Sequence, residues 1–152
     1  MKKTGLIVFS SPSGGGKTTI IHAVREKITE LHYSVSSTTR SQRDGEVDGV
    51  DYQFLSHEEF EAAVNHNDFI EYEDVHGFYY GTRKSLIDKS LASGHNLVFD
   101  LDVNGAFSLK KLYPYALLVY IDVPSVDILR DRLVNRNREA TGEIEKRLTR
   151  YK

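Results

Sequence analysis

The chain has 152 residues, of which 39% are hydrophobic and 28% are charged, and these proportions suit one globular domain with a core. Its 20 basic and 22 acidic side chains leave a formal charge of -2, so no overall positive field favours nucleic acid or an anionic membrane. This balance of charge means that any anion must be bound by a local group of residues. Because the sequence contains no cysteine, disulfides and cysteine-rich zinc sites are excluded, and we expect a cytoplasmic protein.

The first apolar segment, residues 5–10, has the sequence GLIVFS. Its apolar run LIVF is too short for a signal peptide or a membrane span, so we expect the first strand of a cytosolic protein. Segments 96–101 and 116–121 are also continuously apolar, which is typical of strands covered on both faces. A helix is expected from residue 16 or 17 to about residue 31, with its apolar face formed by Ile20, Val24, Ile28 and Leu31.

Three further helices have recognisable starts. Ser56 and Glu59 have the spacing of a capping box, and Ser125 opens a helix directly after a proline. Thr82 is expected to cap a helical segment that Gly94 ends. The alternation of strands and helices predicts an α/β fold with a parallel sheet and right-handed crossovers.

Residues 33–82 interrupt this alternation. Segments 33–39, 50–56 and 68–75 alternate more strongly between apolar and polar residues, are rich in tyrosine, and are separated by turn-forming sequence such as RDGEVDG. They predict a small mixed sheet inserted into the α/β domain, and we find no internal repeat or linker.

A glycine-rich stretch, SSPSGGGKTTII, follows the first strand at residues 10–21. The glycines at 14–16 allow a tight turn that aims backbone N–H groups inward, Lys17 supplies a positive charge, and the Thr18 hydroxyl can bind magnesium. Ser11 stands where the general phosphate-loop pattern has its first glycine, which requires an ordinary backbone angle there but removes no phosphate donor. The context of strand, loop and helix favours a phosphate-binding loop.

A second group of polar residues lies in the insertion. Arg40 and Arg43 are three residues apart and could converge on one phosphate, and Tyr52 and Tyr80 add phenolic donors.

Three other side chains of the insertion suit a guanine base. A carboxylate at Glu71 can accept hydrogen bonds from N1–H and the exocyclic amine, and the hydroxyl of Ser36 or Thr82 can donate to O6. Because adenine presents a different donor and acceptor edge, such a site would reject it.

The sequence resembles guanylate kinases from its start through Leu148. The resemblance is carried by PSGGGKTT, SVSSTTRSQRDGEVDGVDYQF, FIEY, YYGT, DLDVNG and KRL, in the family's order and spacing. The pattern Arg-x-x-Arg-x-Gly-Glu-x-x-Gly-x-Asp-Tyr at 40–52 is more specific than the phosphate loop. The resemblance implies an α/β phosphate-loop kinase with a parallel core sheet flanked by helices (1–32 and 83–125), a small mixed-sheet GMP-binding insertion (33–82) and a helical lid (126–147).

The implied reaction is phosphorylation of GMP, and of dGMP, by ATP with Mg²⁺. The resemblance assigns ATP to the loop residues Ser13, Gly14, Gly15, Gly16, Lys17, Thr18 and Thr19. It assigns guanine to Ser36, Glu71 and Thr82, and the acceptor phosphate to Arg40, Arg43, Tyr52 and Tyr80.

The resemblance also assigns two aspartates at the end of the strand at 96–101. Asp100 would act on magnesium through water, together with Thr18, and Asp102 on the guanine amine or a nearby arginine. Either aspartate could instead be an ordinary strand-end residue, since carboxylates also cap the following helix.

Catalysis in such a kinase depends mainly on positioning and on neutralising charge. Lys17 and Arg43 belong to the expected catalytic set, and by their place in the family's lid Arg132, Arg136 and Arg147 should reach the bridging phosphates on closure. The lid sequence NRNREATG departs from the family pattern, in which glycine and threonine usually flank the arginine.

The family continues beyond the point that corresponds to Lys152, through another strand and a final helix. The loop before that strand normally carries an Asn-Asp pair beside adenine. We therefore expect the strand at 116–121 to be an apolar edge, and this chain to be less stable and to bind ATP more weakly than a longer one.

Two alternatives remain. One is another kinase on the same scaffold, such as a ribosyl bisphosphate phosphokinase, which would not need Glu71 and Thr82. The other is a non-catalytic guanylate-kinase-like binding module, although such modules usually have a degraded phosphate loop.

Overall fold

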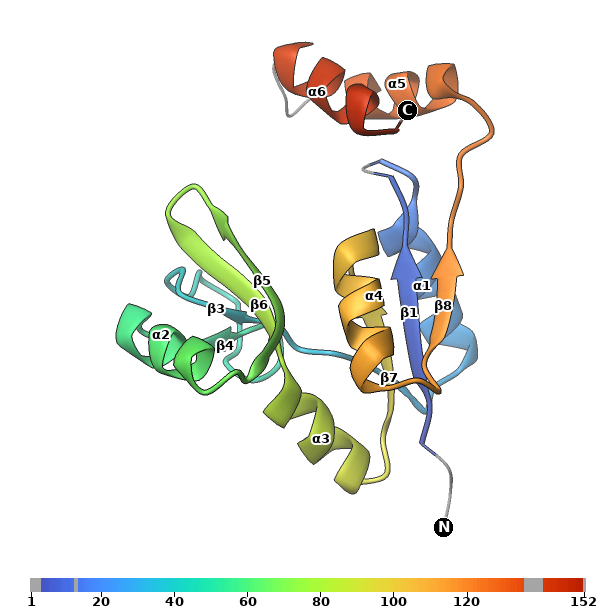
Figure 1. The fold of residues 1–152 in the computed structure, drawn as a ribbon. Coiled ribbons are helices and arrows are strands. Elements are labelled where there is room, and N and C mark those ends of the chain that lie inside the picture. Colours follow the sequence, from blue (N-terminus) through green and yellow to red (C-terminus); the bar gives the residue numbers. More distant parts are fainter. Residues whose placement is uncertain (1–3, 13, 136–140, 152) are drawn as a thin grey trace.

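The protein is described here from a computed structural model, which describes residues 4–12, 14–135 and 141–151. A four-stranded sheet with the order β2-β7-β1-β8 lies at its centre (Figure 1). The strands are β1 (Leu6–Ser10), β2 (Leu31–Tyr33), β7 (Asn96–Asp100) and β8 (Leu117–Tyr120), and every pair is parallel. The predicted α/β fold with a parallel core sheet is confirmed.

Helices cover both faces of this sheet. On β1, Leu6 and Val8 belong to the hydrophobic cluster that contains residues of α3 (Lys84–Ala92) and α4 (Val103–Leu112). Ile7 and Phe9 point the other way and pack with Ile21 of α1 (Lys17–Lys27). Alternate residues of a strand point to opposite faces, so the continuously apolar strand reflects this double cover.

The first helix ends earlier than expected, at Lys27. Ile28 has a non-helical backbone (φ -119°, ψ 83°), and Leu31 begins β2 instead of completing a helical face. The buried residue of the helix is Ile21, whereas Ile20 is 37% exposed and Ile28 48% exposed. Leu31 of β2 belongs to the same hydrophobic cluster as Ile21 of α1. The apolar spacing that predicted a longer helix therefore combined residues from two elements.

The insertion forms a second, mixed sheet with the order β4-β3-β6-β5. Its strands are β3 (Ser37–Thr38), β4 (Gln53–Phe54), β5 (Phe69–Val75) and β6 (Phe78–Arg83), with α2 (His57–Asn65) packed beside them (Figure 1). Strand β3 is parallel to β4 and antiparallel to β6. The predicted mixed sheet and the capping box of Ser56 and Glu59 are both confirmed.

The predicted cap at Thr82 is wrong. Thr82 lies within β6 and donates its hydroxyl to Glu71, and α3 begins two residues later. The start of α3 is held by Asp68, whose carboxylate accepts from the Ser85 backbone N–H (2.8 Å), the Ser85 hydroxyl (2.7 Å) and Arg83 Nε (2.7 Å). Burial acts to raise the pKa of Asp68, but the hydrogen bonds from Ser85 and Arg83 outweigh it and lower that pKa.

The last two described helices, α5 (Val126–Asn135) and α6 (Thr141–Tyr151), pack on each other through their own hydrophobic cluster. In Figure 1 they lie above the loop between β1 and α1, which they meet at Gly14. A Cβ at Gly14 would lie 2.9 Å from Leu133 Cδ2 and 3.3 Å from Leu129 Cδ1. The predicted opening of α5 at Ser125 is confirmed, because its hydroxyl accepts from the Ile128 N–H. Among the described helices, none combines the length and apolarity needed to cross a membrane.

We predict that Asp68→Ala lowers the free energy of unfolding by about 2 kcal/mol at neutral pH, because it leaves the partly buried Arg83 Nε, and the exposed N–H and hydroxyl of Ser85, without this acceptor. Urea denaturation measures this. Since the pKa of Asp68 is lowered in the folded protein, its contribution is present above the unfolded pKa and should vanish as the pH falls through the folded value. The control is Glu145→Ala, whose pair with Arg130 is more than half exposed and should cost at most about 0.5 kcal/mol. Equal losses in the two variants would contradict the assignment.

We also predict that Gly14→Ala loosens α5. An alanine there would have both a strained backbone (φ +85°) and an overlap with Leu133. Gly94→Ala is the matched control, because Gly94 has φ +81° and open space around its Cβ position. Hydrogen exchange at the amides of α5 should accelerate in Gly14→Ala and remain unchanged in Gly94→Ala. Identical exchange in the two variants would show that the contact with α5 does not matter.

Candidate active site

The N-terminus of α1 lacks the usual protein partners. Its N-cap, Gly16, makes no side-chain hydrogen bond, and the first turn contains no acidic residue. By contrast, α2 and α4 are capped by the side chains of Ser56 and Asp102. The first-turn N–H groups of α1 and the positive end of its dipole can therefore hold an anion.

The loop before α1 has the shape that its glycines predict. Gly14 and Gly16 have φ of 85° and 90°, and a Cβ at Gly15 would lie 2.9 Å from both Pro12 O and Ser11 Cβ. Ser11 itself has no positive φ, as expected for a serine in place of glycine. Thr18 and Thr19 are exposed in the first turn of α1, and Ser13 lies outside the described residues.

Lys17 joins this loop to the end of β7. Its Nζ lies 2.6 Å from Asp100 Oδ1 and 3.4 Å from the Leu101 carbonyl oxygen. The two charged side chains are 20% and 24% exposed, so the pair is accessible from the solvent. The structure therefore brings together two residues that the sequence assigned to ATP and to magnesium.

Asp102 joins β7 to the insertion. Its Oδ1 accepts from the Gly105 N–H (2.7 Å) and caps α4, as the ordinary interpretation of a strand-end aspartate expects. Its charge also acts on Glu71 of β5, which accepts a 2.6 Å hydrogen bond from the Thr82 hydroxyl. Glu71, Thr82 and Asp102 are thus neighbours, although they come from separate segments of the chain.

Glu71 is a carboxylate in an unfavourable place for its charge. Burial raises its pKa above the ordinary glutamate value, and the nearby charges of Asp102 and Glu73 raise it further. The hydrogen bond from Thr82 opposes these effects without cancelling them. A ligand that donates hydrogen bonds to Glu71 would relieve this cost.

The phosphate-directed residues of the insertion are organised by Glu46. Its carboxylate accepts two hydrogen bonds from the Arg40 guanidinium (2.7 and 3.0 Å) and one from the Arg43 backbone N–H (2.8 Å). The pKa of Glu46 is lowered, first by the hydrogen bond from Arg40. The sequence analysis missed this role, although Glu46 lies within the Arg-x-x-Arg-x-Gly-Glu pattern that carried the resemblance.

Aromatic rings complete this part of the site. The Arg40 guanidinium lies over the rings of Tyr52 (5.4 Å) and Phe54 (5.7 Å). The rings of Tyr52 and Tyr80 are 6.0 Å apart. Ser36 lies directly before β3 of the same sheet, and its carbonyl accepts from the Gln53 N–H.

Of the three arginines expected in the lid, Arg132 is the one whose side chain the structure describes. Its Nη1 lies 3.4 Å from the Gly15 carbonyl oxygen, so α5 brings a positive charge to the phosphate loop. Arg136 lies outside the described residues, and nothing is described of the side chain of Arg147 within α6.

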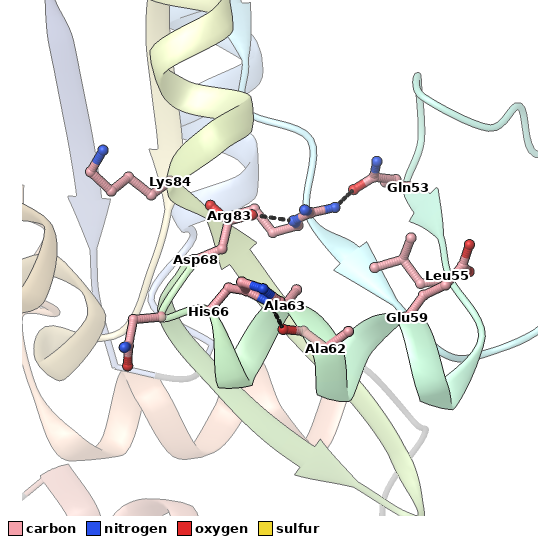
Figure 2. A pocket seen from close by; sticks show the side chains of 10 residues that line it. Gln53, Leu55, Glu59, Ala62, Ala63, His66, Asp68, Arg83 and Lys84 are labelled. Carbon is pink, nitrogen blue, oxygen red and sulfur yellow. Dashed lines mark hydrogen bonds and ion pairs between the residues drawn. The ribbon is translucent and has the colours of Figure 1, made fainter.

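An open pocket of about 720 Å³ lies away from this site, between α2 and the start of α3 (Figure 2). Its charged groups are engaged with protein partners. Figure 2 shows Arg83 bonded to Asp68 and to Gln53, and the Glu59 carboxylate accepts from the Ser56 N–H. The phosphate-loop edge of the sheet, with its uncapped helix and accessible charges, is therefore the candidate active site.

Comparison with known proteins gives a consistent result. A sequence model of the family described as guanylate kinase matches residues 3–152. Two curated guanylate kinases are 50% identical over 95% of this chain and 75% of their own length (Chlorobaculum tepidum) and 45% identical over 94% and 69% (Helicobacter pylori). A crystal structure of guanylate kinase from Anaplasma phagocytophilum has a TM-score of 0.60 and 26% identity, covering 99% of this chain and 84% of that one. The chain belongs to the guanylate kinase family.

Proposed function

We propose that this protein transfers the γ-phosphoryl group of ATP to GMP or dGMP, giving ADP and GDP or dGDP. One observation carries the proposal. Lys17 of the phosphate loop contacts Asp100, while Asp102, two residues further on, lies beside Glu71 and its partner Thr82. Because residues two apart in a chain are separated by about 7 Å at most, a phosphate site and a purine site flank the same strand end.

The residues of each half have distinct tasks in this proposal. The N–H groups of the loop with Lys17 hold the phosphates of ATP, and Glu71 with Thr82 holds guanine through its N1–H, 2-amino and O6 groups. Arg40 and Arg43, with the phenols of Tyr52 and Tyr80, hold the phosphate of GMP. Residues 33–82 would thus be the GMP-binding part and residues 126–147 the lid.

The transfer itself is a direct displacement. An oxygen of the GMP phosphate, already deprotonated at neutral pH, attacks the γ-phosphorus of ATP, and the bond to the β–γ bridging oxygen breaks so that ADP departs. Lys17, Arg43 and Arg132 neutralise the charge that develops during this step, and we assign the same task to Arg136 and Arg147. No covalent intermediate is needed.

The donor set also fits magnesium. The Thr18 hydroxyl in the first turn of α1 and the Asp100 carboxylate at the end of β7 offer hard oxygen ligands. Within the described part of the chain, no three histidine, cysteine or acidic side chains gather as a metal site, and in this proposal Asp100 acts on the metal through water. When bound, Mg²⁺ would neutralise charge on the ATP phosphates.

The two alternatives make different demands on these residues. A phosphorylated sugar has no purine base, so a kinase acting on it would not need the hydrogen-bonded pair of Glu71 and Thr82. An assay of GMP against phosphorylated sugars separates the two activities. A non-catalytic module has no use for an uncapped α1 with an intact Gly16, Lys17 and Thr18. A cytoplasmic location remains a prediction, in agreement with the cysteine-free sequence.

We predict that Lys17→Met lowers kcat by about 10²-fold or more, because it removes a positive charge directed at the transferred phosphoryl group.

We also predict that Glu71→Gln raises KM for GMP about tenfold or more with little change in KM for ATP, since it removes an ionic acceptor that contacts the base only. A coupled assay with ATP, magnesium and GMP measures both. Turnover that survives both substitutions would refute the proposed site, and no turnover by the unmodified chain would favour the binding module.

The raised pKa of Glu71 leads to a further prediction. The guanine edge donates to the ionised carboxylate, so guanosine binding should weaken as the pH falls through a value above the ordinary glutamate pKa of about 4.3. Guanosine is used because it has no phosphate to titrate, and calorimetry measures its affinity. Glu71→Gln should remove this pH dependence, whereas Glu61→Gln on the exposed side of α2 should retain it.

The same shift has a consequence for stability. A carboxyl group whose pKa is raised in the folded protein stabilises it below the unfolded pKa and loses that contribution as the pH rises through the folded value. Glu71→Gln should therefore stabilise the empty protein at pH 7 while weakening guanosine binding. A variant that loses both stability and affinity would contradict this assignment.

A further inference from the structure

Gly105 occupies a crowded position between the two halves of the site. It is buried in the first turn of α4, and its N–H donates to Asp102 Oδ1 (2.7 Å). A Cβ added at Gly105 would lie 3.1 Å from Glu71 Cγ and 3.2 Å from Asp102 Oδ1. Carbon atoms in contact are normally about 3.5–4.0 Å apart, so a Cβ at residue 105 would be closer to Glu71 than an ordinary contact allows.

The backbone at Gly105 does not itself require glycine. The residue lies within a helix and has no positive φ. Glycine is among the least favourable residues in a helix, so alanine would suit this position better if only the helix mattered. The contact with Asp102 belongs to the helix cap, whereas the contact with Glu71 comes from β5 of the insertion. The space taken by Glu71 is therefore what distinguishes this position.

Glu71 is fixed from two sides. Thr82 holds its Oε1 at 2.6 Å, and its Cγ lies 3.1 Å from where a Cβ at residue 105 would stand. A methyl group at residue 105 would force the side chain of Glu71 to move by a few tenths of an ångström. Because hydrogen bonds weaken steeply with misalignment, such a shift would disturb the bond to Thr82 or the bonds to the base.

We propose that Gly105 is a positioning residue that sets base specificity: the space left by its missing side chain lets Glu71 present its carboxylate to both the N1–H and the 2-amino group of a guanine. This inference rests on the proposed function, and it extends the specificity determinants to a residue that itself offers no side chain to the ligand. A base that lacks the 2-amino group makes one bond fewer to Glu71 and should depend less on its placement.

The test compares Gly105→Ala with Lys111→Ala, which introduces an alanine at an exposed position of the same helix, outside the proposed site and the lid. The substrates are GMP and IMP, which lacks the 2-amino group. Gly105→Ala should lower kcat/KM for GMP about tenfold and that for IMP distinctly less, so that the GMP/IMP ratio falls. KM for ATP should be unchanged, and Lys111→Ala should retain the wild-type ratio.

A stability measurement separates positioning from a structural role. The thermal midpoint of Gly105→Ala should equal or exceed that of the wild type, because alanine favours the helix. In the double variant with Glu71→Gln, Gly105→Ala should cause little further loss for GMP, since the carboxylate that it displaces is already gone.

Three results would overturn the inference: a wild-type GMP/IMP ratio in Gly105→Ala, a lowered midpoint, or fully additive losses in the double variant. Failure of the proposed function looks different. In that case the wild-type chain itself would not turn over GMP, and both conclusions would fall. If the wild type turns over GMP and Gly105→Ala retains its base preference, only the role of Gly105 is refuted.

Discussion

The parallel hydrogen bonding of β1 with β7 is the constraint on which the candidate site depends. Phe9 is in register with Asp100, and the Leu101 N–H continues the ladder to the Phe9 carbonyl. Because parallel strands end at the same edge, the phosphate loop that leaves β1 and the acidic residues that follow β7 must lie side by side. An antiparallel pairing of the same strands would have placed them at opposite ends of the sheet.

Charge is arranged around this edge in a definite order. Lys17 neutralises Asp100, Asp102 caps α4, and Glu71 of the insertion remains as a half-buried carboxylate with a raised pKa. The hydroxyl of Thr82 does not neutralise it. The empty protein therefore holds Glu71 at a cost, which a ligand with donor groups at the right positions would relieve. In the proposed function, recognition of guanine and the stability of the empty protein are therefore coupled through this one side chain.

The sequence predicted elements whose signals are local. The parallel strands, the capping box at Ser56 and the glycine loop were recognised because burial on two faces, a cap and a tight turn each leave a pattern within a few residues. The predicted end of α1 is too late because Leu31 fits the apolar pattern of the helix but belongs to β2. From that strand it is buried in the same cluster as Ile21. The predicted cap at Thr82 is wrong because its hydroxyl bonds to Glu71, a partner 11 residues away across a hairpin.

The functional assignments divide in the same way, between local sequence signals and contacts that only the folded chain makes. Individual chemistries such as those of Lys17 and Arg40 follow from residue type and motif. Glu46 and Gly105 both lie within the motifs of the resemblance, but the hydrogen bonds of Glu46 and the space that we propose Gly105 leaves for Glu71 are visible only in the folded structure. The expected edge at 116–121 agrees with the position of β8 at the end of the core sheet, where Leu117 and Tyr120 are more than half exposed.

The central claim is that a donor-phosphate site and a guanine site flank the same end of β7, close enough for direct transfer. The most direct test is calorimetric binding of an analogue in which adenosine and guanosine are joined by a polyphosphate chain. The account predicts one analogue per chain, an affinity at least about 10²-fold above that of GMP or ATP alone, and its loss in either Lys17→Met or Glu71→Gln. An affinity no better than that of GMP alone, or binding of two analogue molecules per chain, would contradict it.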